Sequence, residues 1–386
     1  MIVVIAEFWL ALWLFVLTGL ILSPLLWIGA VLLAVVLFGS CLDRINIDIP
    51  NNDLPIVVDG LITDEPGPYT VQITRALPLN ADLNFIKPVS AKSVTIFDNV
   101  GNVEQLKELE IGVYQTKTNG IRGVVGREYF IRIETRDGKV YESIPDKLNP
   151  VGKVDSVYYE FESFQPINEP TRYGFKVFAD ARGVPNGDNL FRWKFRATFE
   201  LDGYPDSHTV GREGDPCSPA PRPCGGDGPG GSCTCCKCWA TVSETQPTVS
   251  DNQFVSNGVF KKVHVGYAAL EYFPFLIKYR LEVRQMSLSR TAFEYWKTIQ
   301  SQKEGTASLF QPPTGKTRSN LFEKNGKTDV QGIFYAAGVK TKYAYIKNAD
   351  VPIRLKVAKW NCVDGRIAED CRLAYPFSTT EKPADW

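Results

Sequence analysis

Residues 191–201 read Phe-Arg-Trp-Lys-Phe-Arg-Ala-Thr-Phe-Glu-Leu, and this stretch decides the fold class. Apolar side chains occupy every odd-numbered position, and charged or polar side chains occupy every even-numbered one. Successive side chains of a strand point to opposite faces, so this alternation predicts a half-buried strand of an antiparallel sheet. Residues 277–286 repeat the pattern and predict a second strand of the same kind.

Shorter strand-like runs precede this pair. Each is rich in β-branched or aromatic residues and is bounded by Pro, Gly, Asn or Asp, as strands are. The runs are residues 56–62, 69–74, 93–97, 129–135 and 140–143. Asp137-Gly138 joins the last two as a hairpin. Short strands at this density predict an immunoglobulin-like β-sandwich over residues 53–150, which Asn149-Pro150-Val151-Gly152 ends.

Residues 151–386 predict a larger antiparallel β-rich domain. Its other strand-like runs are residues 157–161, 173–179, 333–346 and 353–358. One helix is expected, from Ser289 to about Lys303, with Thr291 and Glu294 as a capping box. Its apolar residues at helical spacing are Ala292, Tyr295, Trp296 and Ile299. The fold class expected for the whole chain is therefore mainly β, with one or few helices.

The composition excludes several classes of function. The 386 residues include 43 Lys+Arg and 43 Asp+Glu, so the formal net charge is zero. A nucleic-acid binder needs a basic footprint, so no nucleic-acid partner is expected. Only two histidines occur, His208 and His264, which removes most histidine-based catalytic and metal designs.

The first 40 residues decide the expected compartment. An uncharged apolar run from Phe8 to Ser40 ends in Gly39-Ser40-Cys41. An apolar stretch closed by small residues is a signal-peptide pattern, and a following Cys resembles a bacterial lipobox. We therefore expect residues 1–40 to be a leader, Cys41 to carry lipid, and residues 41–52 to be a tether. The run is longer than the apolar part of most signal peptides, and no Lys or Arg precedes it. Two alternatives therefore remain, an uncleaved membrane-spanning anchor and a misassigned start codon.

The remaining eight cysteines suggest cross-links. They are Cys217, Cys224, Cys233, Cys235, Cys236, Cys238, Cys362 and Cys371. Six of them crowd into a Gly- and Pro-rich loop, residues 202–238. An exported protein meets oxidising conditions and a long loop gains from cross-links, so disulfides are favoured. Overlapping C-x₂-C spacings leave a metal site or a redox dithiol as weaker alternatives.

No motif points to catalysis. The Gly-rich run 225–231 neither follows a strand nor opens a helix, so it is not a phosphate loop. The G-x-S-x-G and H-E-x-x-H motifs are absent. We therefore expect no catalytic residue, no metal and no cofactor. The tryptophans could stack sugars, but core packing is favoured; they are Trp193, Trp239, Trp296 and Trp360.

Several segments in order resemble one family over nearly all of the chain after the leader. They are residues 41–44, 56–71, 126–143, 235–239, 289–296, 309–313 and 332–337. The chain is similar to outer-membrane lipoproteins of unknown function found in Bacteroidota (domain of unknown function four-two-four-nine). The resemblance implies an outer-membrane location, genes that often lie beside TonB-dependent transporters, and an N-terminal sandwich. It implies no activity and no catalytic residue.

Two hypotheses follow from different classes. The favoured one is a lipid-anchored, non-enzymatic accessory or ligand-capture protein of a TonB-dependent transport system, with a peptide or glycan as a possible ligand. In this hypothesis the loop at residues 202–238 contacts the partner. The alternative is a hydrolase of glycans or peptides on a β scaffold, because the two carboxylates of a glycosidase can lie far apart in sequence.

Cys41 is expected to be the first residue of the mature protein and to carry lipid. Mass spectrometry of the native N-terminus should find an acylated Cys41 and no residues before it. Recovery of unmodified residues 1–40 attached to the folded body would instead support a spanning anchor.

Overall fold

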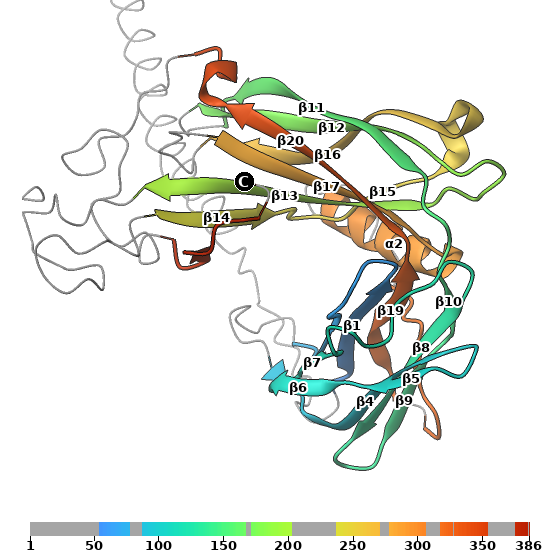
Figure 1. Ribbon diagram of the computed structural model, residues 1–386. Coiled ribbons are helices and arrows are strands. Elements are labelled where there is room, and N and C mark those ends of the chain that lie inside the picture. The colour runs from blue at the N-terminus through green and yellow to red at the C-terminus, as the bar shows by residue number, and fades with distance from the viewer. Residues whose placement is uncertain are drawn as a thin grey trace, which may run out of the picture. The chain divides into compact units, whose positions relative to one another are not determined.

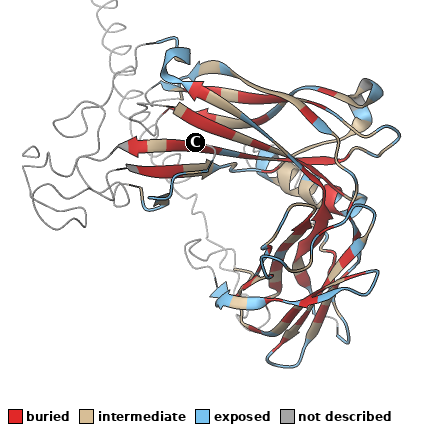
Figure 2. Cartoon of the chain, in the orientation of Figure 1, coloured by how far each residue is buried: buried red, intermediate tan, exposed pale blue. Residues whose placement is uncertain are grey.

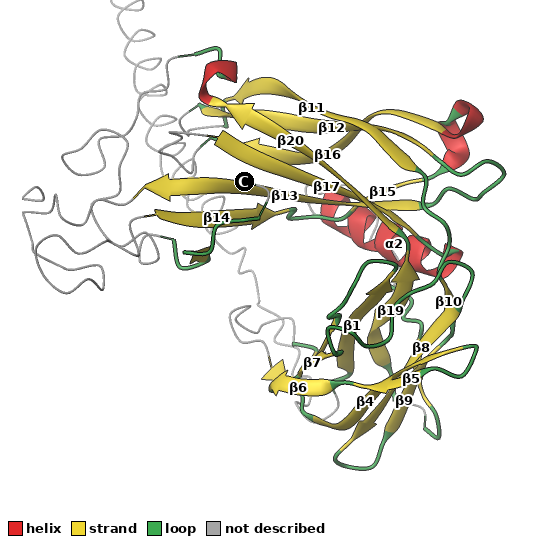
Figure 3. Ribbon diagram, in the orientation of Figure 1, coloured by secondary structure: helices red, strands yellow, loops and turns green. Residues whose placement is uncertain are grey.

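The computed structural model describes residues 54–77, 87–166, 171–202, 237–270, 278–305, 317–326, 328–353, 375–384 and 386. Residues 53–386 form one compact unit. Its described part consists of four β-sheets, short 3₁₀ turns and the helix α2 (Arg290–Gly305), as Figures 1 and 3 show. The mainly β fold expected from the sequence is confirmed.

Two sheets form an N-terminal sandwich. The first has the order β19-β1-β2-β7-β6, with β3 beside β2. Its strands are β1 (Ile56–Thr63), β2 (Thr70–Arg75), β3 (Lys87–Pro88), β6 (Lys107–Glu110), β7 (Val113–Gln115) and β19 (Val330–Ala337). The second has the order β18-β9-β8-β4-β5, with β10 beside β8. Its strands are β4 (Ala91–Asp98), β5 (Val103–Gln105), β8 (Glu128–Thr135), β9 (Val140–Ser143), β10 (Asp146–Lys147) and β18 (Leu321–Glu323).

The alternation along these strands explains the sandwich core. In β8, Tyr129, Ile131 and Ile133 are fully buried, while the residues between them are half-buried. They pack with Val58, Val71 and other apolar side chains of both sheets into one core. All five runs expected in this region coincide with strands, namely β1, β2, β4, β8 and β9.

The N-terminal sandwich also contains strands from much later in the chain. These strands lie outside its expected extent, residues 53–150. β19 pairs with β1 in parallel, from Ile56 beside Val330 to Thr63 beside Ala337. β18 pairs with β9. The run at residues 333–346 is therefore not one strand, because it is divided at Gly338 between β19 and β20 (Val339–Lys347) in different sheets.

The other two sheets form a second sandwich. One has the order β11-β12-β16, and the other β20-β17-β13-β14-β21, with β15 beside β13. Their strands are β11 (Lys153–Phe164), β12 (Arg172–Arg182), β13 (Phe191–Asp202), β14 (Lys237–Ser243), β15 (Thr248–Ser250), β16 (Val259–Ala269), β17 (Lys278–Ser287) and β21 (Ser378–Thr379). The odd-numbered residues of β13 lie in the core between the sheets, and Trp193 is fully buried there. Figure 2 shows the buried residues as stripes along the strands.

Helix α2 packs at the junction of the two sandwiches. Ala292 and Phe293 are buried with Leu61, Tyr335 and Met286, which come from three different strands. The expected capping box at Thr291 and Glu294 is wrong. The helix begins at Arg290, so Thr291 lies inside its first turn, and the Ser289 side chain accepts from the Ala292 amide at 3.1 Å instead.

Three passages of the chain between the sandwiches meet at Ser287. Its hydroxyl donates to the Asn149 carbonyl at 2.6 Å and accepts from the Gly338 amide at 2.9 Å. The Asn149 side chain donates in turn to the Leu288 carbonyl at 3.1 Å. A Cβ at position 338 would lie 2.9 Å from the Asn149 carbonyl oxygen, so a glycine fits this close approach.

Asp146 lies next to this junction and is 4% exposed. Its carboxylate accepts from the Ser289 hydroxyl at 2.5 Å and from the Ala336 amide at 2.9 Å, so it joins β10 to α2 and β19. Burial raises the pKa of Asp146 to about 6 despite these two hydrogen bonds. The folded chain therefore binds this proton more tightly than the unfolded chain. The contribution of Asp146 to stability is greatest below pH 4 and falls as the pH rises through about 6.

Asp146→Asn should remove this pH dependence, because an amide of the same shape can accept from Ala336 without a charge to bury. The free energy of unfolding of the variant relative to the wild type should rise by roughly 2–3 kcal/mol between pH 4 and pH 7. Urea unfolding of both proteins across that range measures the difference. A constant difference would show that Asp146 keeps an ordinary pKa in the folded chain.

Candidate functional site

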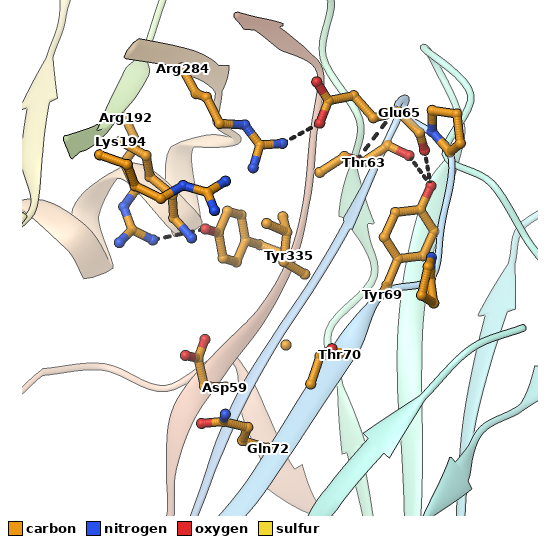
Figure 4. A pocket seen from close by; sticks show the side chains of 15 residues that line it. Asp59, Thr63, Glu65, Tyr69, Thr70, Gln72, Arg192, Lys194, Arg284 and Tyr335 are labelled. Atoms are coloured by element: carbon orange, nitrogen blue, oxygen red, sulfur yellow. Dashed lines mark hydrogen bonds and ion pairs between the residues drawn. The ribbon is translucent and has the colours of Figure 1, made fainter. Parts of the chain in front are cut away.

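A cleft of about 590 Å³ lies where the two sandwiches face each other. One side comes from β1, β2 and the turn between them, and the other from β13 and β17 (Figure 4). The lining residues are Asp59, Gly60, Leu61, Thr63, Glu65, Pro66, Pro68, Tyr69, Thr70, Gln72, Arg192, Lys194, Arg196, Arg284 and Tyr335. This volume falls within the range of small-molecule sites in proteins.

Four cations form one side of the cleft, which we call the cationic wall: Arg192, Lys194, Arg196 and Arg284. The first three are successive even-numbered residues of β13, which the alternation turns away from the core. Lys194 lies directly across from Arg284 in the pairing of β13 with β17. Like charges placed opposite each other on neighbouring strands are destabilising, so this arrangement is not explained by the stability of the sheet.

Arg192 is the most firmly held of the four and is 8% exposed. Its Nη1 donates to the Tyr335 hydroxyl at 2.9 Å, and its guanidinium carbon lies 3.5 Å from the ring centre of Trp296. Among the described residues, the nearest carboxylate oxygen is that of Glu244, at 3.8 Å. The Nε of Arg192 is buried and has no hydrogen-bond partner in the described part of the chain. Side chains of helix α2 and β19 thus hold this guanidinium in place.

The turn between β1 and β2 places a carboxylate against the cationic wall. Glu65 forms an ion pair with Arg284, as Figure 4 shows. Hydrogen bonds made by residues on either side of Glu65 hold this turn in place. The Asp64 carboxylate accepts from the Val339 amide at 2.8 Å, and the Tyr69 hydroxyl donates to the Thr63 carbonyl at 2.7 Å.

Lys194 differs from the other cations of the wall. Arg196 pairs with Glu282 at 2.9 Å and Arg284 pairs with Glu65, but within the described chain Lys194 has no carboxylate oxygen within 4 Å. Burial lowers the pKa of Lys194 to about 8; the neighbouring charge of Arg192 also lowers it, while Glu244 and Asp59 oppose the shift. Its ammonium thus lacks an ion pair with any described carboxylate, and the charges of Glu244 and Asp59 act on it only from beyond ion-pair distance.

The chemistry of the lining favours binding an anion. Guanidinium and ammonium groups form short, charge-assisted hydrogen bonds with carboxylates and phosphates. Thr70 and Gln72 add neutral donors and acceptors from β2. The described lining contains no histidine, cysteine or serine, so the usual nucleophile–base pairs are not present among these residues. No group of three metal-ligating side chains occurs in the described ranges either.

The residues singled out in the sequence lie elsewhere. Cys41 and seven of the eight other cysteines are outside the described residues, as are His208 and Trp360. Cys238 is buried on β14 and is disulfide-bonded. His264 lies on β16, with its ring centre 5.7 Å from that of Phe178. Trp193 and Trp239 are buried, as core packing predicts.

Sequence reasoning missed the cationic wall. It assigned the even-numbered residues of β13 to the solvated face of a half-buried strand, but Arg192 and Thr198 are buried. A signal was present, because three successive even positions of β13 carry Arg, Lys and Arg with no acidic residue among them. A solvated face more often mixes both signs of charge.

A family model described as "Domain of unknown function (DUF4249)" matches residues 43–343. The chain therefore belongs to the DUF4249 family. No curated protein and no solved structure matches it. In the portion of the chain described, no helix has both the length and the apolar character needed to cross a bilayer.

Replacing Lys194 by Met should stabilise the protein, because Met keeps the apolar stem and removes a charge that costs free energy to bury beside Arg284. Since the pKa of Lys194 is lowered, the cost is fully present below pH 8 and is lost as the pH rises toward 10.5. We expect a gain of about 1–3 kcal/mol in the free energy of unfolding at pH 7, which shrinks above pH 8.

Thermal or urea unfolding at pH 7 and pH 9.5 tests this expectation. Lys176→Met is a control, because Lys176 is also partly exposed on a strand, β12, but pairs with Glu162 at 2.6 Å. The control should be neutral or slightly destabilised. A loss of stability in Lys194→Met similar to that of the control would show that the wall tolerates its charges.

Proposed function

We propose that this protein is a lipid-anchored, exported ligand-capture protein without enzymatic activity, and that the cleft between its sandwiches holds the ligand. The observation that carries the proposal is the cleft itself. It combines a volume suited to a small molecule with polar side chains converging from two sandwiches. Rigid strands supply most of these side chains, as binding sites require.

The cleft supports capture better than catalysis. A hydrolase needs a nucleophile and base, or a pair of carboxylates that flank the scissile bond. The carboxylates lining the cleft are Asp59, which is exposed, and Glu65, which is engaged by Arg284. The described lining therefore offers no free pair of carboxylates to flank a scissile bond.

The anchor and the partner in this proposal come from the sequence. The Gly39-Ser40-Cys41 ending of the leader supports lipidation at Cys41. The resemblance to lipoproteins encoded beside TonB-dependent transporters supports an outer-membrane location and such a transporter as the partner. In this role the protein holds a ligand near the transporter, and the loop at residues 202–238 contacts that partner.

Native mass spectrometry of protein purified gently from its own membranes tests ligand capture. The wild type should carry a small molecule in stoichiometric amount. Thr70→Trp should lose it, because Thr70 is an exposed strand residue that lines the cleft and a tryptophan there fills the space. Gln105→Trp is the control, since it adds the same bulk at an exposed position of β5 outside the lining.

Equal retention in both tryptophan variants would contradict a ligand in the cleft. Conversion of the retained molecule into a product of different mass during incubation would favour the hydrolase. A co-purification of the lipidated protein with the transporter encoded beside its gene tests the partner. Absence of the transporter from such preparations, with the ligand retained, would restrict the proposal to capture alone.

A further inference from the structure

We propose that the cleft selects a small ligand bearing a carboxylate or phosphate group, which Lys194 and Arg284 bind together, and that the Glu65 carboxylate occupies part of this anion site until the ligand displaces it. The inference rests on the proposed capture function and adds the chemical class of the ligand. The shared chemistry is a compact, planar or tetrahedral oxyanion.

Two like charges lie opposite each other on the cationic wall. Lys194 and Arg284 are cross-strand partners, and the side chains of such partners point to the same face of the sheet. Arg192 lines the same cleft two residues before Lys194. An oxyanion between these groups would replace mutual repulsion by attraction. The ligand would thus gain both its own hydrogen bonds and the relief of that repulsion.

Neighbouring side chains hold the Arg192 guanidinium in place. Trp296 lies against the guanidinium, the Tyr335 hydroxyl accepts from its Nη1, and a Glu244 oxygen lies 3.8 Å from its Nη2. A guanidinium held by a ring and a hydroxyl loses little conformational freedom when it binds, which raises affinity for a given set of contacts. Such a fixed fork matches the oxygen spacing of carboxylates and phosphates.

Glu65 shows that the cationic wall binds a carboxylate group. A carboxylate from this chain already occupies one position on the wall, paired with Arg284. Its hydrogen bond with the Thr341 hydroxyl is long, at 3.5 Å. Its neighbours hold the turn independently, through Asp64 and Tyr69, so the Glu65 side chain can leave Arg284 without loss of the turn. Glu65 therefore acts as an internal competitor of the ligand.

Isothermal titration calorimetry in low-chloride buffer at pH 7 tests the inference with two probes, citrate and inorganic phosphate. The wild type should bind at least one of them, and the probe that binds identifies carboxylate or phosphate as the favoured source. Lys194→Met should weaken that binding about tenfold or more. Glu65→Gln should strengthen it by roughly threefold to tenfold, because it frees Arg284.

The matched controls are Lys176→Met and Glu162→Gln, which remove a paired cation and its carboxylate from the other sheet of the second sandwich. Both should bind as the wild type does. Melting temperatures of all variants verify folding, and Lys194→Gln replaces Lys194→Met if the latter is not folded. An affinity unchanged by either substitution of Lys194, or weakened by Glu65→Gln in a folded protein, would overturn the inference.

The two proposals fail differently. If neither probe binds the wild type or Glu65→Gln, the anion site is excluded. Should the wild type still carry a small molecule that Thr70→Trp loses, capture stands and only the ligand class proposed here is wrong. Should no molecule be retained either, both proposals fall together.

Discussion

The Ser287 hydroxyl is the interaction on which the arrangement of the two sandwiches depends. It joins Asn149, where the chain leaves the first sandwich, to Gly338, where the chain passes from β19 into β20. Ser287 itself ends β17 and leads into α2. One side chain thus links three passages of the chain and gives partners to the Asn149 carbonyl and the Gly338 amide, which would otherwise be unpaired at the junction.

The junction of the two sandwiches also determines how the two sides of the cleft are placed. Its cations lie on β13 and β17 of the second sandwich, while Asp59, Glu65 and Thr70 come from the first. The junction core packs Leu61 of β1 against Tyr335 of β19 and Met286 of β17. Because apolar cores are close-packed, this contact fixes the distance between the two sides of the cleft more firmly than surface ion pairs could.

Local patterns were sufficient for the strands but not for their partners. Alternation along residues 191–201 and 129–135 identified β13 and β8, since the period of a half-buried strand is visible in a few residues. The parallel pairing of β1 with β19 has no such local signal, because it joins residues about 270 positions apart. The cationic wall was missed although three successive even positions of β13 carry cations, because those positions look solvated until the first sandwich is placed across from them.

The parallel pair of β1 and β19 also has a consequence for how the chain is made. Synthesis delivers the N-terminal strands first, so β1 must wait for residues 330–337 with one hydrogen-bonding edge open. An open edge of apolar strands is a template for pairing with another chain. Contacts this distant in sequence form slowly. Early chain termination would therefore yield an aggregation-prone fragment, and a chaperone that shields β1 would be most useful to the nearly finished chain.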